Sequence, residues 1–489
     1  MTRNQSLDLT AIAHQAMVEN GFEPDIPRPV LDELQSLQPK PQPDALASAT
    51  QDLRSLLWSS IDDRKSRDLD QVEYAEHMSG GDIRVLVGIA NVDALVRKGS
   101  AIDSHAAANG TSVYTGVRTF PMLPEELSTD KTSLVGGADR SSLVNEMIVA
   151  SDGTVKSSKV FPALLHNFAK LSYEAVGAWL DGQAPVPPEV ARVPGMEAQI
   201  RLQLDAAQHL RQLRREHGAL ELDTIQASPV LDNEGKVTDL SVTERNSARD
   251  LIENFMIAAN VAMAQFLEAK GVPSIRRVVR TPEHWPRIVE IAESFGERLP
   301  AQPDSRALAD FLEHRKTADP DHFPDLSLSI VKLLGPGEYL VQAPGAASEG
   351  HFGLAVRDYT HSTAPNRRYA DLIIQRVLKA ALAQTSAPYS ESELTGIAAH
   401  CTEREDAARK VERKMRKVAA AVLMQNRIGE VFDAIVTGAT PKGIFARTLR
   451  PPVDGRVVRG EQGLRVGEKI QVKLLSAEPE RGFIDFGRV

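Results

Sequence analysis

The sequence predicts an α+β protein with a small helical module at its amino end and an all-β barrel at its carboxyl end. Residues 8–19 repeat apolar side chains at helical spacing, and 243–269 do so over a longer amphipathic stretch. By contrast, 83–92 and 141–151 are short runs with the composition of strands. The tail, 430–489, consists of short alternating runs separated by glycine and proline. Such a tail has the size of one OB barrel.

Length and composition divide the chain into three parts. Its 489 residues exceed one ordinary domain. We expect 1–45 to be the helical module, with a second helix over 29–37 and a Pro-rich polar linker over 38–45. A large mixed region follows over 46–428, and the OB barrel takes up 429–489.

Charge and cysteine content limit the class of protein. The formal net charge of -9 argues against a uniformly basic surface that coats nucleic acid, but not against a nucleic-acid enzyme with a basic channel. Cys401 is the single cysteine, at the start of a charged helix expected over 401–428, so no intrachain disulfide forms. The amino end lacks a signal-peptide pattern, and no apolar run approaches the roughly 18 residues of a membrane span. We expect a soluble, cytoplasmic protein.

The most informative stretch, SIDDRKSRDLDQVEY, crowds four aspartates into nine residues. Asp68 and Asp70 point the same way in an extended segment, and Asp62 can fold back beside them from the preceding turn. Converging carboxylates raise one another's pKa unless a cation lies between them. Magnesium suits a few carboxylates with water and phosphate oxygens, and can activate water against a phosphodiester. The structural alternative is an exposed acidic turn balanced by the basic residues beside it.

A second stretch, YTHSTAPNRRYADLIIQR, joins two arginines to a helix expected over 366–383. Pro365 suits the first helical turn, which would place Arg367 and Arg368 beside backbone N–H groups that attract anions. Arginine matches phosphate oxygens with two parallel hydrogen bonds, and Asp371 stands four residues after Arg367, where it can orient the guanidinium. The pattern is that of a phosphate clamp, or of a solvated helix end with a local ion pair.

Both stretches resemble the signatures of one nuclease family. SIDDRKSRDLDQ resembles the acidic signature of the ribonuclease II (RNB-domain) exoribonucleases, and YTHSTAPNRRYADL is similar to their arginine signature. FPMLPEELS (120–128), HNFAKLSYEAVGAWL (166–180), LIENFMIAAN and EGHFGLAVRDY resemble further family segments, in the family's order. The resemblance implies an exoribonuclease catalytic domain over 46–428 and an RNA-binding OB fold over 429–489.

The resemblance also implies a metal site. Its ligands would be Asp62, Asp68 and Asp70, which would hold Mg²⁺, with Mn²⁺ as a possible substitute. Asp68 and Asp70 would also belong to the catalytic residues. Arg367 would be the catalytic arginine that stabilises the transition state.

Further residues would bind RNA by the same resemblance. Tyr114 would stack on the 3′-terminal bases, and Tyr173 would lie near the sugar and favour RNA. Arg367 and Arg368 would contact the RNA, and Glu412 would lie in the catalytic chamber. Alternatively, the two tyrosines are half-buried packing residues and Glu412 is a solvated helix charge.

The chain departs from the family pattern in three places. Gln71 stands where the family usually has a fourth aspartate, so a metal would bind less tightly or take Glu73 or Asp63 as a substitute ligand. Gln375 replaces a usual histidine. The pair of cold-shock barrels that precedes the family's catalytic domain has no counterpart, and 1–45 stands in its place.

The predicted function is that of a 3′→5′ exoribonuclease, which hydrolyses single-stranded RNA to ribonucleoside 5′-monophosphates. Its partner is the 3′ end of single-stranded RNA, with no membrane and no protein partner expected. One alternative is a catalytically weakened RNA-binding regulator, which Gln71 favours. Another is a phosphodiesterase acting on DNA or small nucleotides, which a comparison of ribose with deoxyribose oligomers would separate.

Overall fold

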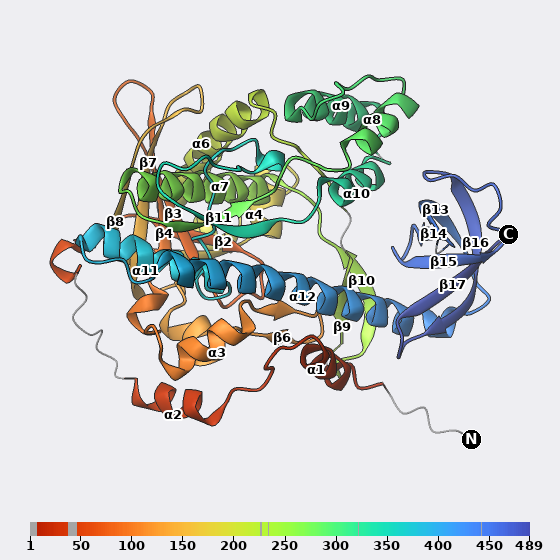
Figure 1. Ribbon diagram of the computed structural model, residues 1–489, viewed down its shortest axis with the longest axis horizontal. Coiled ribbons are helices and arrows are strands. Elements are labelled where there is room, and N and C mark those ends of the chain that lie inside the picture. The colour runs from red at the N-terminus through yellow and green to blue at the C-terminus, as the bar shows by residue number, and fades with distance from the viewer. Residues whose placement is uncertain (1–6, 38–45, 225–226, 233, 321, 442) are drawn as a thin grey trace.

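The computed structural model describes residues 7–37, 46–224, 227–232, 234–320, 322–441 and 443–489. The Pro-rich linker expected over 38–45 lies outside the described residues. A curved sheet surrounded by helices forms the large body of the molecule, and one long helix leads from this body to a separate β-barrel (Figure 1).

The central sheet has six strands in the order β1-β8-β2-β3-β4-β7. Their bounds are β1 (Gln51–Asp52), β2 (Trp58–Asp62), β3 (Gln71–His77), β4 (Ile83–Ala90), β7 (Asp139–Val149) and β8 (Val155–Ser172). Because the long β8 pairs with β2 in parallel and with β7 in antiparallel fashion, the sheet curls back on itself. The aspartate stretch therefore forms the connection between β2 and β3, at one end of the sheet.

The sheet and its helices enclose the main core, in which β4 is almost continuously buried. The bounds of the surrounding helices are α3 (Ala101–Asn109), α4 (Tyr173–Leu180), α5 (Pro188–Ala191), α6 (Met196–Glu216), α7 (Ser247–Ala269), α8 (Trp285–Ser294), α9 (Ser305–Ala318), α10 (Phe323–Leu334), α11 (Tyr369–Ala383) and α12 (Glu391–Met424). In Figure 1, α7 lies along one side of the sheet and α12 crosses the molecule towards the barrel. Helices α8–α10 pack around a smaller core of their own.

Three helices begin at different residues from those that periodicity predicts, and in two of them a side-chain cap sets the start. The α7 helix starts at Ser247 rather than 243, after Asn246 accepts a hydrogen bond from the N–H of Arg249. The α12 helix starts ten residues before 401, where Ser390 and Glu393 form a reciprocal capping box. The α11 helix starts at Tyr369 rather than 366.

The carboxyl-terminal barrel confirms the all-β prediction. Its strands are β13 (Val431–Thr440), β14 (Gly443–Thr448), β15 (Asp454–Arg459), β16 (Lys469–Glu478) and β17 (Phe483–Arg488), closed in the order β13-β14-β15-β17-β16. Phe432, Val436, Val457 and Phe486 fill it, together with Met424 from the end of α12. Three small antiparallel pairs complete the fold: β5 (Val113–Tyr114) with β6 (Thr119–Phe120), β9 (Ala227–Leu231) with β10 (Val237–Val242), and β11 (Ser274–Val278) with β12 (Glu338–Gln342).

The amino-terminal helices α1 (Leu9–Glu19) and α2 (Arg28–Ser36) pack onto the large body. Met17 and Phe22 join Met415 of α12 in a buried apolar cluster. Arg404 of α12 donates hydrogen bonds to the backbone carbonyl of Gly21 at 2.8 Å and to that of its neighbour in the chain. These helices are therefore packed as a brace rather than held apart.

Within the described ranges, none of the helices has both the length and the apolar character needed to cross a membrane.

Candidate active site

The acidic stretch brings its aspartates to one end of the central sheet in different surroundings. Asp62 ends β2, and its Oδ1 atom accepts hydrogen bonds from the N–H of Asp63 (2.7 Å) and the hydroxyl of Ser66 (3.0 Å). Asp70 directly precedes β3 and is 1 % exposed, whereas Asp68 is half-buried. Burial raises the pKa of Asp62, and it raises the pKa of Asp70 to about 7. The charged forms of both carboxylates are therefore held at a free-energy penalty.

Arg367 reaches this stretch from the other end of the sequence. Its Nε atom donates a hydrogen bond to Oδ2 of Asp70 at 3.2 Å, and the backbone N–H of Asn366 donates to Oδ1 of Asp70 at 2.9 Å. Burial is the larger influence on the pKa of Asp62 and of Asp70, and the positive charge of Arg367 opposes it in both. The Arg367 side chain is still 44 % exposed, so part of its guanidinium remains accessible to a ligand.

The local ion pair predicted for Arg367 is wrong. Asp371 instead pairs with Arg368 at 2.7 Å and accepts a hydrogen bond from the N–H of Ala364 at 2.8 Å. The helix begins at Tyr369 with Arg368 in an extended N-cap conformation, so neither arginine lies inside the first turn. A contact between residues four apart requires helical backbone at both, which is missing at Arg367.

Tyr114, at the end of β5, joins the aspartate stretch to α12. Its hydroxyl donates a hydrogen bond to Oδ2 of Asp68 at 2.9 Å, and its backbone N–H donates to Oε1 of Glu412 at 3.1 Å. Burial raises the pKa of the Tyr114 hydroxyl and that of the Glu412 carboxyl. The phenol therefore stays a hydrogen-bond donor at neutral pH, while 41 % of the residue remains exposed.

The residues predicted to bind RNA, apart from Tyr173, line a single cavity of about 250 Å³. Tyr114, Arg367, Arg368 and Glu412 all face it, beside Arg409 of α12. Glu405 also lines it and pairs with Arg409, and Asp371 pairs with Arg368. The partly exposed Arg367 is therefore the arginine best placed to bind an anion such as phosphate. The hydrogen bonds of Tyr114 and Arg367 connect the cavity to Asp68 and Asp70.

Tyr173, the first residue of α4, is not among the residues that line this cavity. Burial raises the pKa of its hydroxyl, and the negative charges of Asp62 and Glu73 raise it further. The guanidinium of Arg249 lies over the ring, 4.3 Å from its centroid. Tyr173 therefore lies within electrostatic reach of Asp62, and one face of its ring is covered by an arginine.

The two carboxylates considered as substitutes near Gln71 differ sharply. Asp63 is exposed and pairs with Arg249 at 2.8 Å. Glu73 is 0 % exposed, and neither of its carboxylate oxygens has a hydrogen-bond partner among the described residues. Burial, and then the charge of Asp62, raise the pKa of Glu73 well above its usual range. Of the two, Glu73 is the one whose oxygens are uncommitted.

The donor chemistry of this site fits a hard divalent cation. Within the described part of the chain, no three His, Cys, Asp or Glu side chains stand close enough together to enclose a metal ion. Magnesium does not need such an enclosure, since it binds through one or two carboxylates and completes its shell with water and substrate phosphates. The oxygens of Asp62, Asp68 and Asp70, together with the unpartnered carboxyl of Glu73, are the ligand type that it takes.

Sequence reasoning missed two contributors to this site. The backbone N–H of Asn366 donates a hydrogen bond to Asp70. The sequence feature that could have indicated this contact is the position of Asn366 directly before the two arginines. Arg249 covers the ring of Tyr173 although no motif points to it. This contact requires α4 and α7 to pack side by side. The sequence does not reveal that packing, because Tyr173 and Arg249 are 76 residues apart.

Comparisons with known proteins find two family matches along the chain. The RNB domain family matches residues 50–384, and the RNase II-type exonuclease C-terminal S1 domain matches residues 430–489. Ribonuclease R of Thermotoga maritima is 31 % identical over 466 residues, covering 89 % of this chain and 64 % of that protein. Ribonuclease R of Escherichia coli is 29 % identical over 483 residues, covering 91 % of this chain and 58 % of that protein.

A solved structure gives the same fold. The apo form of Mycoplasma genitalium RNase R superposes with a TM-score of 0.88 at 23 % identity, covering 99 % of this chain and 78 % of that one. The same RNase R in complex with ribose methylated single-stranded RNA also gives a TM-score of 0.88. The chain spans about six-tenths of the length of the two Ribonuclease R proteins. Since the RNB domain match extends over more than half of its residues, this chain belongs to the RNB domain family and ends in an RNase II-type S1 domain.

Proposed function

We propose that this chain is a 3′→5′ exoribonuclease that hydrolyses single-stranded RNA to ribonucleoside 5′-monophosphates. The observation that carries the proposal is the link between Asp70 and Arg367, which sets a carboxylate site directly against an arginine-lined cavity. Hydrolysis of a phosphodiester needs both groups. A water must be activated for attack, and the negative charge that develops on the phosphate oxygens must be stabilised. The proteins that match along the chain are named Ribonuclease R, which supports this reaction.

Each side chain takes a role that its contacts support. Arg367, partly exposed beside Asp70, neutralises charge that develops on the scissile phosphate. Arg368, fixed by Asp371, lines the cavity that receives the RNA end. Tyr114 offers an exposed aromatic ring on which a terminal base stacks without regard to sequence. Its hydrogen bond to Glu412 fixes where that ring stands.

Asp62, Asp68 and Asp70 would hold the metal. When bound there, Mg²⁺, or Mn²⁺ in its place, supplies an activated water and stabilises the leaving oxygen of the phosphodiester. Asp70 is kept in place for this role by the N–H of Asn366 and by Arg367, whether or not it carries a proton. The one buried cysteine suits a reducing compartment, and we propose the cytoplasm.

The experiment is a time course with 5′-labelled single-stranded RNA and magnesium, run with the wild type and with Asp70→Asn. We expect stepwise shortening from the 3′ end, release of 5′-monophosphates, and a loss of at least about 100-fold in the variant. EDTA should also stop the reaction. Asp82→Asn is the matched control, because Asp82 pairs with Lys156 at the far end of the β3–β4 hairpin.

Two results would overturn the proposal. RNA that the wild type binds but never shortens, even with manganese, would identify a regulator that binds RNA without cleaving it. Equal rates on ribose and deoxyribose oligomers would identify a phosphodiesterase of broader substrate class.

A further inference from the structure

Arg249 holds Tyr173 from the start of α7. Its guanidinium lies over the tyrosine ring at 4.3 Å from the centroid, within the range of a cation–π contact. Its Nη2 atom also donates to Oδ1 of Asp63 at 2.8 Å and approaches Oε1 of Glu174 at 3.5 Å. Both contacts leave from Nη2, so the two carboxylates anchor that end of the guanidinium while its plane lies over the ring.

The backbone of the same tyrosine is held by the residue that caps α7. Asn246 accepts a hydrogen bond from the N–H of Arg249 at 3.0 Å, and its Nδ2 atom donates to the carbonyl of Tyr173 at 3.1 Å. A side chain on Gly177 would collide with Asn246, since an added Cβ would lie 2.3 Å from it. The start of α7 therefore packs closely against the start of α4. It contacts Tyr173 twice, at the backbone carbonyl through Asn246 and at the ring through Arg249.

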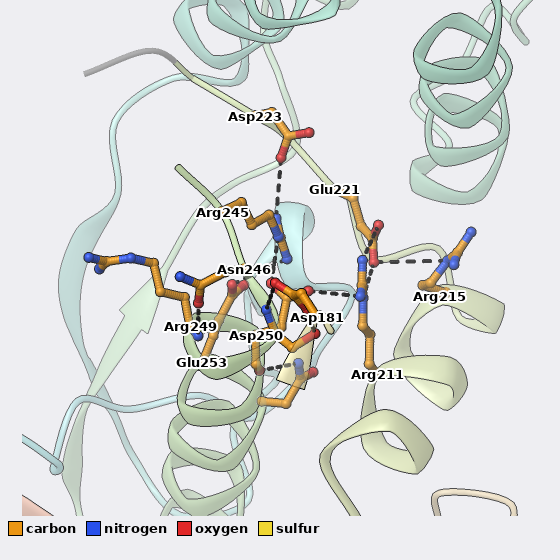
Figure 2. A network of polar contacts seen from close by, with 12 residues as sticks. Asp181, Arg211, Arg215, Glu221, Asp223, Arg245, Asn246, Arg249, Asp250 and Glu253 are labelled. Carbon is orange, nitrogen blue, oxygen red and sulfur yellow. Dashed lines mark hydrogen bonds and ion pairs between the residues drawn. The ribbon is translucent and has the colours of Figure 1, made fainter. Parts of the chain in front are cut away.

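Arg249 differs from the neighbouring arginines. In Figure 2, Arg211 and Arg245 point into a cluster of carboxylates, whereas the side chain of Arg249 extends away from that cluster. Arg245 pairs with Asp250 at 2.6 Å and also contacts Asp223 and Glu253. Its charge is therefore balanced within the cluster, which ties α6 to α7. Arg245, four residues from Arg249, provides a matched control.

The covered ring limits what Tyr173 can offer to a substrate. One face of the ring is occupied by Arg249, and the partly buried residue packs against the main core, so its polar group, the hydroxyl, is what it can offer to a substrate. Among the described residues, none forms a hydrogen bond with this hydroxyl. It stays protonated at neutral pH, because burial raises its pKa. A neutral phenol aimed beside the metal-site aspartates can donate to, or accept from, a ribose 2′-hydroxyl.

We infer that Arg249 is a positioning residue, which holds the ring of Tyr173 so that its hydroxyl reads the 2′-hydroxyl of the RNA and favours ribose over deoxyribose. This inference rests on the proposed function, because it assumes that an RNA 3′ end occupies the site. Arg249 itself need not contact the RNA. Its effect is transmitted through the orientation of one tyrosine.

The test compares an RNA oligomer with the same oligomer carrying one 2′-deoxyribose near its 3′ end. The ratio of kcat/KM for the two substrates is measured for wild type, Tyr173→Phe, Arg249→Gln, Arg249→Lys and the double variant Tyr173→Phe/Arg249→Gln. We expect Tyr173→Phe to reduce the ratio by about tenfold, the effect of losing one well-placed hydrogen bond. Arg249→Gln should reduce it similarly, Arg249→Lys should restore part of it, and the double variant should lose no more than either single variant.

Arg245→Gln controls for loss of a positive charge beside the start of α7, because Arg245 pairs with Asp250 rather than with Tyr173. Its ratio should match that of the wild type. The inference fails if Arg249→Gln lowers both substrates equally, or if the two substitutions are additive. A failure of this inference is distinguished from a failure of the proposed function by equilibrium binding. Both oligomers are bound to Asp70→Asn and to Asp70→Asn/Arg249→Gln, in which no cleavage is expected. A preference for ribose that disappears with Arg249→Gln supports the inference even without cleavage, whereas an unchanged preference overturns it.

Discussion

Arg367 donates a hydrogen bond from its Nε atom to Oδ2 of Asp70 at 3.2 Å, although 297 residues separate the two in the chain. Asp70 is almost completely buried, and Arg367 is nearly half exposed. A buried carboxylate thus fixes the inner part of a guanidinium whose outer part faces the cavity. This arrangement orients the arginine before any substrate arrives, which is the condition for strong electrostatic stabilisation.

Arg367→Lys should therefore lower kcat more than it raises KM. Lysine keeps the positive charge but has a single nitrogen, which cannot bond to Asp70 and a phosphate with the same geometry. We expect a loss of about 100-fold in kcat, measured under steady-state conditions with single-stranded RNA. An unchanged kcat with a raised KM would mean that Arg367 serves binding alone.

Asp70→Asn should stabilise the metal-free protein at high pH. The pKa of Asp70 is raised by burial to about 7, above its ordinary value of about 3.9 in the unfolded chain. Below pH 4 the carboxyl is protonated in both states and has no effect. Between pH 4 and 7 the unfolded chain loses the proton first, so stability falls as pH rises, and above pH 7 the penalty is complete.

Thermal unfolding in EDTA across this pH range tests the expectation. The penalty removed above pH 7 is on the order of 4 kcal/mol. The melting temperatures of wild type and variant should converge near pH 4 and separate as pH rises. A variant that is less stable than wild type at pH 8 would contradict the assignment.

Gln71→Asp should strengthen metal binding. Gln71 begins β3 directly after Asp70, and a carboxylate there adds a hard anionic ligand to the site. We expect the magnesium concentration for half-maximal activity to fall several-fold, and Mn²⁺ binding measured by electron paramagnetic resonance to tighten in parallel. Gln71→Glu is the control, because it adds the same negative charge as Gln71→Asp on a side chain that is one methylene longer. Unaltered Mn²⁺ affinity in both variants would exclude residue 71 from the metal's surroundings.

Glu221→Gln should destabilise the protein at neutral pH but not in acid. Burial alone would raise the pKa of Glu221, yet its hydrogen bonds to Arg211 and the charges of Arg211 and Arg215 lower it. Its stabilising effect is therefore present above the unfolded pKa of about 4.3 and is lost as pH falls through the lower folded value. Figure 2 shows the cluster to which this pair belongs.

Urea unfolding at pH 7 and at pH 3 measures the effect. We expect a loss of about 1–3 kcal/mol at pH 7, because Arg211 would keep only part of its charge compensation. The difference between variant and wild type should shrink at pH 3. Equal losses at both pH values would indicate a packing defect instead.

Met17→Ala should loosen the hairpin that carries Tyr114. Met17 of α1 is 2 % exposed and belongs to the cluster that contains Val113 and Phe120 on either side of the hairpin. Loss of a buried methionine costs about 2–5 kcal/mol. We expect faster hydrogen exchange over 113–120 and a higher KM for RNA.

Leu34→Ala in α2 is the matched control, because Leu34 packs into the main core instead of this cluster. It should lower overall stability without selectively exposing 113–120. If both variants change exchange over 113–120 equally, α1 has no special role in supporting Tyr114.

The sequence by itself predicted most of the elements and the residue types of the candidate site. Apolar periodicity marked α1, α7 and the barrel strands, because side chains that share one face must be buried together. The aspartate stretch and the arginine pair predicted a site for metal and phosphate, because crowded carboxylates raise one another's pKa unless a cation lies between them. Helix ends were less predictable, since caps such as Ser390 with Glu393 act through hydrogen bonds that periodicity does not contain.

Tertiary structure alone decided which charged groups meet. Asp371 pairs with Arg368 rather than Arg367, because the backbone at Arg367 is not yet helical. Asp70 took Arg367 instead, from the opposite end of the sequence. Arg249 covers Tyr173 because α4 and α7 pack side by side. Local spacing fixes contacts within an element, whereas contacts between elements depend on the burial of all their apolar faces at once, which no short stretch of sequence encodes.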